Sequence, residues 1–73
     1  MTLNISDCYM ALEISGIVVA DATAQANSQW QVSTWPVLLD RNQAITALTI
    51  TELLELGYPS SHPLVVALRS ELA

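Results

Sequence analysis

The sequence predicts one α+β domain over residues 1–73, with an antiparallel β-hairpin followed by two α-helices, an order written ββαα. Up to Pro36, β-branched and aromatic residues alternate with polar ones, which is typical of strands. After Pro36, apolar residues recur at the spacing of a helix face. A two-stranded hairpin is marginally stable alone, and 73 residues bury only a small core. We therefore expect a homo-oligomer, in the simplest case a dimer, to complete the fold.

The first predicted strand covers residues 10–23, MALEISGIVVADAT. Alternate residues from Leu12 to Ala20 share one face, and the opposite face mixes polar and apolar side chains. Gly16 lies inside this pattern, which indicates a bulge or a close approach by another backbone. The preceding residues 1–9 show no clear period, and we expect a short strand or an ordered tail there.

The second predicted strand is Trp30–Trp35, WQVSTW, antiparallel to the first. A turn over residues 24–29 joins the two strands, and its expected tip is Asn27-Ser28. Pro36 ends the strand because proline has no N–H to donate to the ladder.

The first predicted helix follows Asp40 and runs to Leu56. Aspartate is a preferred N-cap, and Gln43 stands three residues later, at the reciprocal position of a capping box. Gly57 suits the left-handed position after the helix, and Pro59 follows it.

This helix is apolar nearly all round, which predicts that it is buried on more than one side. A hairpin and one short helix are too little to surround it, so we expect a second copy or a host protein to complete its burial. A row of small polar residues along it, including Thr49, fits either a helix–helix contact or hydroxyl bonds to the helix's own carbonyls. Tryptophans are favoured interface anchors. The residues predicted to form the interface are Trp30, Trp35, Ile45, Thr49, Ile50, Leu53 and Leu56.

The last predicted helix runs from about Pro63 to Leu72. Pro63 suits the first turn of a helix, and either Ser61 or His62 is expected at the cap.

Composition restricts the partners. The chain is 52% apolar and 12% charged, which is too apolar for disorder and indicates an exposed apolar patch that meets another chain. The net charge is −5, with two arginines and no lysine, so nucleic acids and anionic membranes are poor partners. The longest apolar run is far shorter than the roughly twenty residues that span a bilayer. The single cysteine, Cys8, excludes an internal disulfide and fits a reducing cytoplasm.

No catalytic, metal, cofactor or small-molecule site is expected. Ser60–His62 looks like a nucleophile beside a base, but neighbouring side chains rarely face each other, and helix capping explains the segment better. One histidine and one cysteine cannot build a metal cage of such ligands. Glu52 and Glu55 lie one helical turn apart and are expected to be solvated.

The segment WQVSTWPVLLDRNQAITALTITELLE, Trp30–Glu55, resembles a group of small uncharacterised proteins of actinobacteria and their phages. Those proteins have a Trp-x-Val-Ser strand, a proline, and then LDRNQAITA leading into a helix, which matches residues 39–47 here. The link after Pro36 is shorter than in the group and lacks the Gly-Arg that often follows the proline. The group has no established activity, so no functional residue carries over. The resemblance implies a bacterial or phage-infected cytoplasm and favours a mobile-element accessory protein.

The leading hypothesis is a small non-enzymatic protein-interaction protein with an accessory or regulatory role, acting as a homo-oligomer or by binding a host protein. The alternative is a helix-turn-helix-like DNA-binding regulator, although its recognition helix would be mostly apolar. A weaker alternative is an acidic inhibitor that occupies the site of a nucleic-acid-binding protein. Salt separates these hypotheses, because binding of an apolar partner changes little with salt whereas the other two modes weaken steeply.

Overall fold

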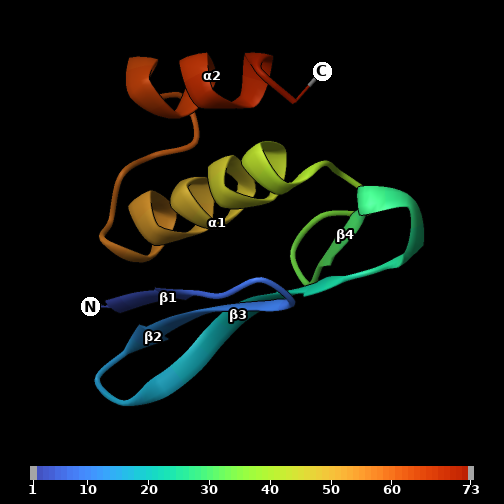
Figure 1. Ribbon diagram of the computed structural model, residues 1–73. Coiled ribbons are helices and arrows are strands. Elements are labelled where there is room, and N and C mark those ends of the chain that lie inside the picture. Colours follow the sequence, from blue (N-terminus) through green and yellow to red (C-terminus); the bar gives the residue numbers. More distant parts are fainter. Residues whose placement is uncertain (1, 73) are drawn as a thin grey trace.

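The computed structural model describes residues 2–72 and arranges them in three layers (Figure 1). The elements are β1 (Thr2–Ile5), β2 (Tyr9–Ile14), β3 (Ile17–Ala24), β4 (Trp30–Val32), α1 (Arg41–Glu55) and α2 (Pro63–Ser70). The strands form an antiparallel sheet in the order β1-β2-β3-β4, α1 packs on one face of that sheet, and α2 packs on α1. The α+β class is confirmed, but the sheet has four strands where the sequence predicts two.

The single strand predicted over residues 10–23 is wrong, because the chain reverses at Ser15 and Gly16. Both residues have positive φ, 53° and 79°, as a two-residue type I′ hairpin turn requires. β2 and β3 therefore pair antiparallel, and Ile14 lies opposite Ile17 next to the turn. A Cβ atom at Gly16 would meet nothing within 4 Å, so the glycine is needed for the turn and not for a close backbone approach.

The N-terminal strand β1 pairs with β2 through a second tight turn. Ser6 N–H donates to the Tyr9 carbonyl at 2.9 Å, and Tyr9 N–H donates to Ser6 Oγ at 3.1 Å. The short strand expected within residues 1–9 is thus present, while Met1 lies outside the described residues.

The predicted turn over residues 24–29 is confirmed as a short 3-10 turn at Ala26–Ser28. Its tip residues Asn27 and Ser28 both have positive φ, near 60°. β4 then ends at Val32, three residues before the predicted end of the second strand.

After β4 the chain turns back on itself and covers the outer edge of that strand. Trp35 N–H donates to the Val32 carbonyl at 3.1 Å, which closes the turn. Leu39 then pairs antiparallel with Trp30, and each N–H donates to the other residue's carbonyl, at 3.0 and 2.7 Å. The backbone N–H and C=O of Trp30, on the outer side of β4, are therefore both satisfied by Leu39.

Both ends of α1 are defined by the residues that the sequence predicts. Asp40 Oδ1 accepts from Gln43 N–H at 2.7 Å, and Gln43 Oε1 accepts from Asp40 N–H at 3.1 Å, so the capping box is confirmed. Gly57 has φ 97°, and its N–H and that of Tyr58 donate back to carbonyls in the last turn of the helix. This is the Schellman pattern, and it satisfies carbonyls that the helix leaves unpaired.

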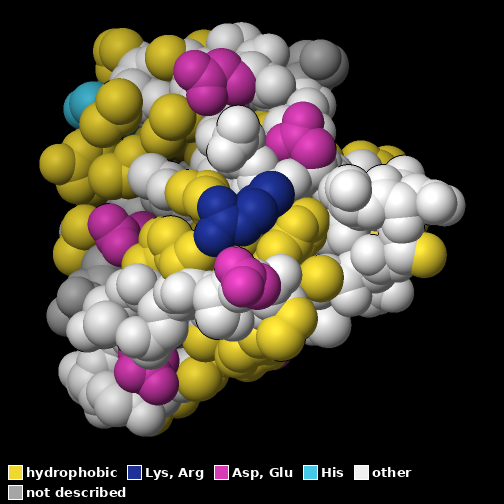
Figure 2. Space-filling view, viewed as in Figure 1, with side chains coloured by type: hydrophobic (Ala, Val, Ile, Leu, Met, Phe, Trp, Pro, Cys, Tyr) yellow, Lys and Arg dark blue, Asp and Glu magenta, His cyan; other side chains and the backbone are white. Residues whose placement is uncertain are grey.

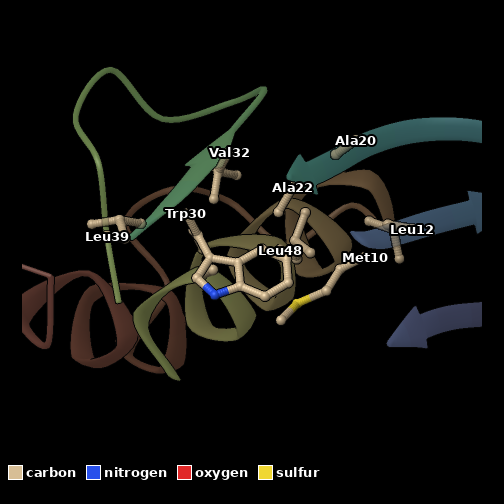
Figure 3. Packing of buried hydrophobic residues seen from close by; sticks show 10 residues of the cluster. Met10, Leu12, Ala20, Ala22, Trp30, Val32, Leu39 and Leu48 are labelled. Carbon is tan, nitrogen blue, oxygen red and sulfur yellow. The ribbon is translucent and has the colours of Figure 1, made fainter. Parts of the chain in front are cut away.

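The main core lies between the sheet and α1, and the Trp30 indole lies at its centre (Figure 3). Alanines on β3 and α1 let the helix approach the sheet closely, and the indole fills the space beside Leu48 and Met10. The buried members are Met10, Leu12, Ala20, Ala22, Trp30, Val32, Leu39, Ala44, Ala47 and Leu48.

A second, smaller core lies between α1 and α2, where Ile50 and Leu53 pack against Val65. Helix α1 is thus buried on two sides, as its composition predicts. However, α2 supplies the second side, so the burial of α1 does not depend on a second copy of the chain. His62 caps α2, its Nδ1 accepting from Leu64 N–H at 3.1 Å, and the helix ends at Ser70, two residues before the predicted end.

Candidate functional site

Three of the predicted interface residues are core residues of this chain. Trp30 is 3% exposed between the sheet and α1, while Ile50 and Leu53 are buried beneath α2. Their side chains have no free surface, so the prediction that they form an interface is corrected. The sequence pattern identifies them as strongly apolar residues, but it does not reveal that another part of the same chain covers them.

Three more of the predicted residues are half-buried. Trp35 and Ile45 pack against the edge of the main core. Thr49 donates its hydroxyl to the Ile45 carbonyl at 2.8 Å, and Thr46 does the same to Asn42 at 3.1 Å. Of the two explanations offered for the row of small polar residues, these bonds support the helix's own carbonyls as partners.

Leu56 is the one predicted interface residue that is exposed, and it belongs to a group of exposed apolar side chains around the connection between α1 and α2. Its side chain is 56% exposed and that of Leu64 is 46% exposed. Figure 2 shows hydrophobic side chains gathered around the histidine, at the end of the molecule where Figure 1 has this connection. We name this group the corner patch, and its members are Leu54, Leu56, Tyr58 and Leu64.

The corner patch has a defined backbone beneath it. The Schellman bonds fix the position of Tyr58, and its ring meets the His62 imidazole edge-on with centroids 5.0 Å apart. His62 is held in turn by its bond to Leu64 N–H. The patch is therefore presented by two capped helix ends and a connection that they hold in place.

The charges near the corner patch are negative. Residues 42–68 contain no lysine or arginine, and they include Glu52 and Glu55 in the last turns of α1. Glu55 is exposed beside the patch residues Leu54 and Leu56. The corner patch is therefore an apolar surface with carboxylates at its rim.

A second exposed apolar group lies at the tip of the β2–β3 hairpin, where Ile17 is 67% exposed. The ladder shifts register between Leu12 and Glu13, and Val19 is the extra residue on the opposite strand. A shallow open depression of about 220 Å³ lies nearby, lined by Val18, Val19, Ala20, Asp21 and Ser33. It is too open to enclose a small molecule.

The sheet face opposite α1 carries a small polar network. Tyr9 Oη donates to Asp21 Oδ2 at 3.2 Å, and Asp21 N–H donates to Ser33 Oγ at 2.9 Å. Partial desolvation and the Asp21 carboxylate, with a smaller contribution from Glu13, raise the pKa of Tyr9 above its ordinary value of 10.0. A phenol with a raised pKa stays neutral at ordinary pH, so Tyr9 acts in this network as a hydrogen-bond donor.

Within the segment Ser60–His62, His62 is the N-cap of α2, and its Nδ1 accepts the Leu64 N–H. Cys8 is exposed, and no group of three or more His, Cys, Asp or Glu residues within positions 2–72 is placed to hold a metal ion.

The helix pair gives no support to a DNA-reading surface. The exposed side chains of α2 include Leu64, Val66 and Ala67, and Arg69 is its one cation. Base readout requires polar side chains on the exposed face of a recognition helix. Of the helices in residues 2–72, neither is long and apolar enough to cross a membrane.

Sequence reasoning missed Leu54, Tyr58 and Leu64 as surface residues. The pattern that identifies Tyr58 and Leu64 is local: residues 56–64, LGYPSSHPL, form a connection without formal charge in which two leucines and a tyrosine flank two prolines. Connections usually lie on the surface, so large apolar residues there indicate a contact site.

Comparisons of the chain with models of protein families, with curated proteins and with solved structures find no match. The resemblance of Trp30–Glu55 to small actinobacterial and phage proteins therefore remains a prediction.

Proposed function

We propose that the protein is a small non-enzymatic interaction protein that binds another protein through the corner patch. The observation that supports this proposal is the exposure of Leu56 and Leu64 at a capped helix corner, next to Leu54 and Tyr58. Isolated exposed leucines are common, whereas several large apolar side chains on one supported surface indicate a binding site.

The chemistry of the patch suggests what its partner presents. Leu56 and Leu64 would bury apolar side chains, and the Tyr58 ring would add an aromatic contact. Because Glu52 and Glu55 lie nearby and no cation lies within residues 42–68, the partner segment carries lysine or arginine beside its apolar residues. Such rim charges contribute mainly to the rate of association, so salt weakens binding only moderately.

The proposed setting is a bacterial cytoplasm, with an origin in a phage or another mobile element. The single free cysteine, Cys8, is exposed and fits a reducing compartment. The LDRNQAITA segment, residues 39–47, supports the actinobacterial and phage origin by resemblance.

The test is selection of binding peptides from a displayed random library against the purified protein. We expect enriched peptides that combine apolar residues with lysine or arginine. The double variant Leu56→Asp/Leu64→Asp should lower the affinity of the enriched peptides by at least about tenfold, because it places charges where apolar side chains are buried on binding.

The matched control is Val37→Asp/Leu38→Asp, which adds the same two charges at apolar residues that are exposed in the loop before α1. This variant should bind the enriched peptides as the unchanged protein does. Enrichment that the corner-patch variant does not affect, or no enrichment at all, would contradict the proposal.

A further inference from the structure

The sheet has one open edge. Figure 1 shows β1 and β4 on different sides of the sheet, and the order β1-β2-β3-β4 makes them its two edge strands. The return of the chain to Leu39 covers β4 at Trp30. Within residues 2–72, the backbone of β1 pairs only with β2.

The hydrogen-bond alternation identifies which β1 residues present free backbone groups. Ser6 N–H points inward, because it donates to the Tyr9 carbonyl. In an antiparallel ladder successive residues point alternately inward and outward, so Asn4 also points toward β2. Leu3 and Ile5 therefore direct their N–H and C=O groups away from the sheet.

The same two residues direct apolar side chains to the helix side of the sheet. Leu3 lies opposite Leu12 and Ile5 opposite Met10, both of which are in the main core. However, α1 lies over β3 and β4, so Leu3 is only half-buried and Ile5 is 45% exposed. The open edge thus offers backbone hydrogen bonds and uncovered apolar side chains together.

Apart from the short length of β1, four residues, this edge lacks the features by which proteins prevent strand pairing. Natural edge strands are protected by charged residues, proline, bulges or a covering segment. Residues 1–6, MTLNIS, include no charged residue and no proline, and β1 pairs with β2 in unbroken register. The backbone pattern also specifies the occupant, since only an extended strand satisfies alternating N–H and C=O groups.

We propose that the occupant is the β1 strand of a second copy of this chain, paired antiparallel about a two-fold axis at Asn4. In this register Leu3 of each copy lies opposite Ile5 of the other, and each pair exchanges both of its N–H···O bonds. The two sheets become one continuous sheet with both α1 helices on the same face. The uncovered Leu3 and Ile5 side chains of the two copies then pack together, and the Asn4 side chains meet on the polar face.

Symmetry favours a second copy over a foreign strand. An antiparallel pair of identical strands is self-complementary, so the surface needs no separately matched partner. Each copy has a net charge of −5, and the β1 edge is an uncharged surface where two copies can approach. Because salt screens the remaining repulsion, raising the ionic strength should strengthen this dimer.

The test combines the mass in solution with amide hydrogen exchange, both measured over a dilution series of the full chain. We expect a dimer at high concentration and a monomer on dilution. The Leu3 and Ile5 amides should be protected in the dimer and exchange freely in the monomer. The Asn4 amide, which bonds within the sheet, should stay protected in both states and serves as the internal control.

Two variants test the strand itself. Ile5→Lys should weaken dimerisation by at least about tenfold, as edge lysines do, whereas Ser70→Lys, with the same charge change on α2, should leave the dimer intact. Ile5→Pro removes the outward N–H without removing a bond to β2, and it should also give a monomer. Protection of the Asn4 amide reports whether each variant is folded.

The proposal is overturned if the protein is a monomer at every concentration. It is equally overturned by a dimer in which the Leu3 and Ile5 amides exchange freely, or by one that Ile5→Lys does not weaken. The β1 edge and the corner patch are different surfaces, so peptide binding at Leu56 and dimerisation at Ile5 can fail independently. If both hold, the dimer displays two corner patches and binds a repeated partner with avidity.

Discussion

At the scale of single residues, the caps of the helices explain most of the polar side chains that look functional. Asp40 and Gln43 bond each other's backbone N–H groups, and His62 accepts the N–H of Leu64. The polar run DRNQ before the first helix and the SSH run before the second are therefore helix starts.

The contribution of the first cap is measurable. Asp40→Ala removes the acceptor for Gln43 N–H and should lower the free energy of unfolding by about 1 kcal/mol. Urea unfolding measures the change. Asp7→Ala is the control, because it removes an exposed carboxylate with the same charge. An equal effect of the two substitutions would show that net charge, and not the cap, determines the stability change.

The helix-capping residues could be predicted from the sequence because capping is local. The side chain and the N–H groups that it satisfies are three residues apart, so the sequence contains the whole motif. Trp30, Ile50 and Leu53 were misassigned to an interface for the opposite reason. What covers them lies on elements distant in the chain, and a periodic pattern shows that a face is apolar without showing what packs on it.

At the scale of elements, the sheet differs from the predicted two-stranded hairpin mainly because of one turn. Ser15-Gly16 divides a run of fourteen residues that alternates well on both sides of the turn, so the run looks like one strand. Serine-glycine is a recognised turn dipeptide, and the positive φ of both residues shows why it fits here. The turn adds β2 and β3 in place of one strand, and β1 completes the four-stranded sheet.

The helix α2 is the element that replaces the expected second copy. Its buried side chain Val65 packs on Ile50 and Leu53, the residues of α1 that the sheet leaves uncovered. The sheet and α2 thus bury two sides of α1 within one chain, while Leu54 near its C-terminal end stays exposed. The burial of α1 therefore gives no reason to expect a second copy, whereas the open edge of β1 does.

The docking of α2 gives a test at this scale. Val65→Ala should lower the free energy of unfolding by about 2 kcal/mol, because it removes two buried carbons from the small core. Val66→Ala, at the exposed neighbouring position, should change it by no more than roughly 0.5 kcal/mol. Thermal or urea unfolding provides both values. If Val66→Ala costs as much as Val65→Ala, the orientation of α2 on α1 is wrong.

At the scale of the whole molecule, the chain buries one large and one small core and leaves its surplus apolar surface at separate places. The corner patch lies where α1 meets α2, and the uncovered part of the sheet lies beneath Leu3 and Ile5. Composition predicts that such a surplus exists, because more than half of the residues are apolar. Its location depends on which elements pack together, which the composition does not specify.

We propose the corner patch as the surface that binds a partner. The most direct test is an NMR titration of the ¹⁵N-labelled protein with a selected peptide, in which amide shifts are followed residue by residue. We expect the largest shifts within residues 53–66, at both helix ends and their connection, while the amides of β2 and β3 stay unchanged. Largest shifts on the sheet, with residues 53–66 unaffected, would contradict it.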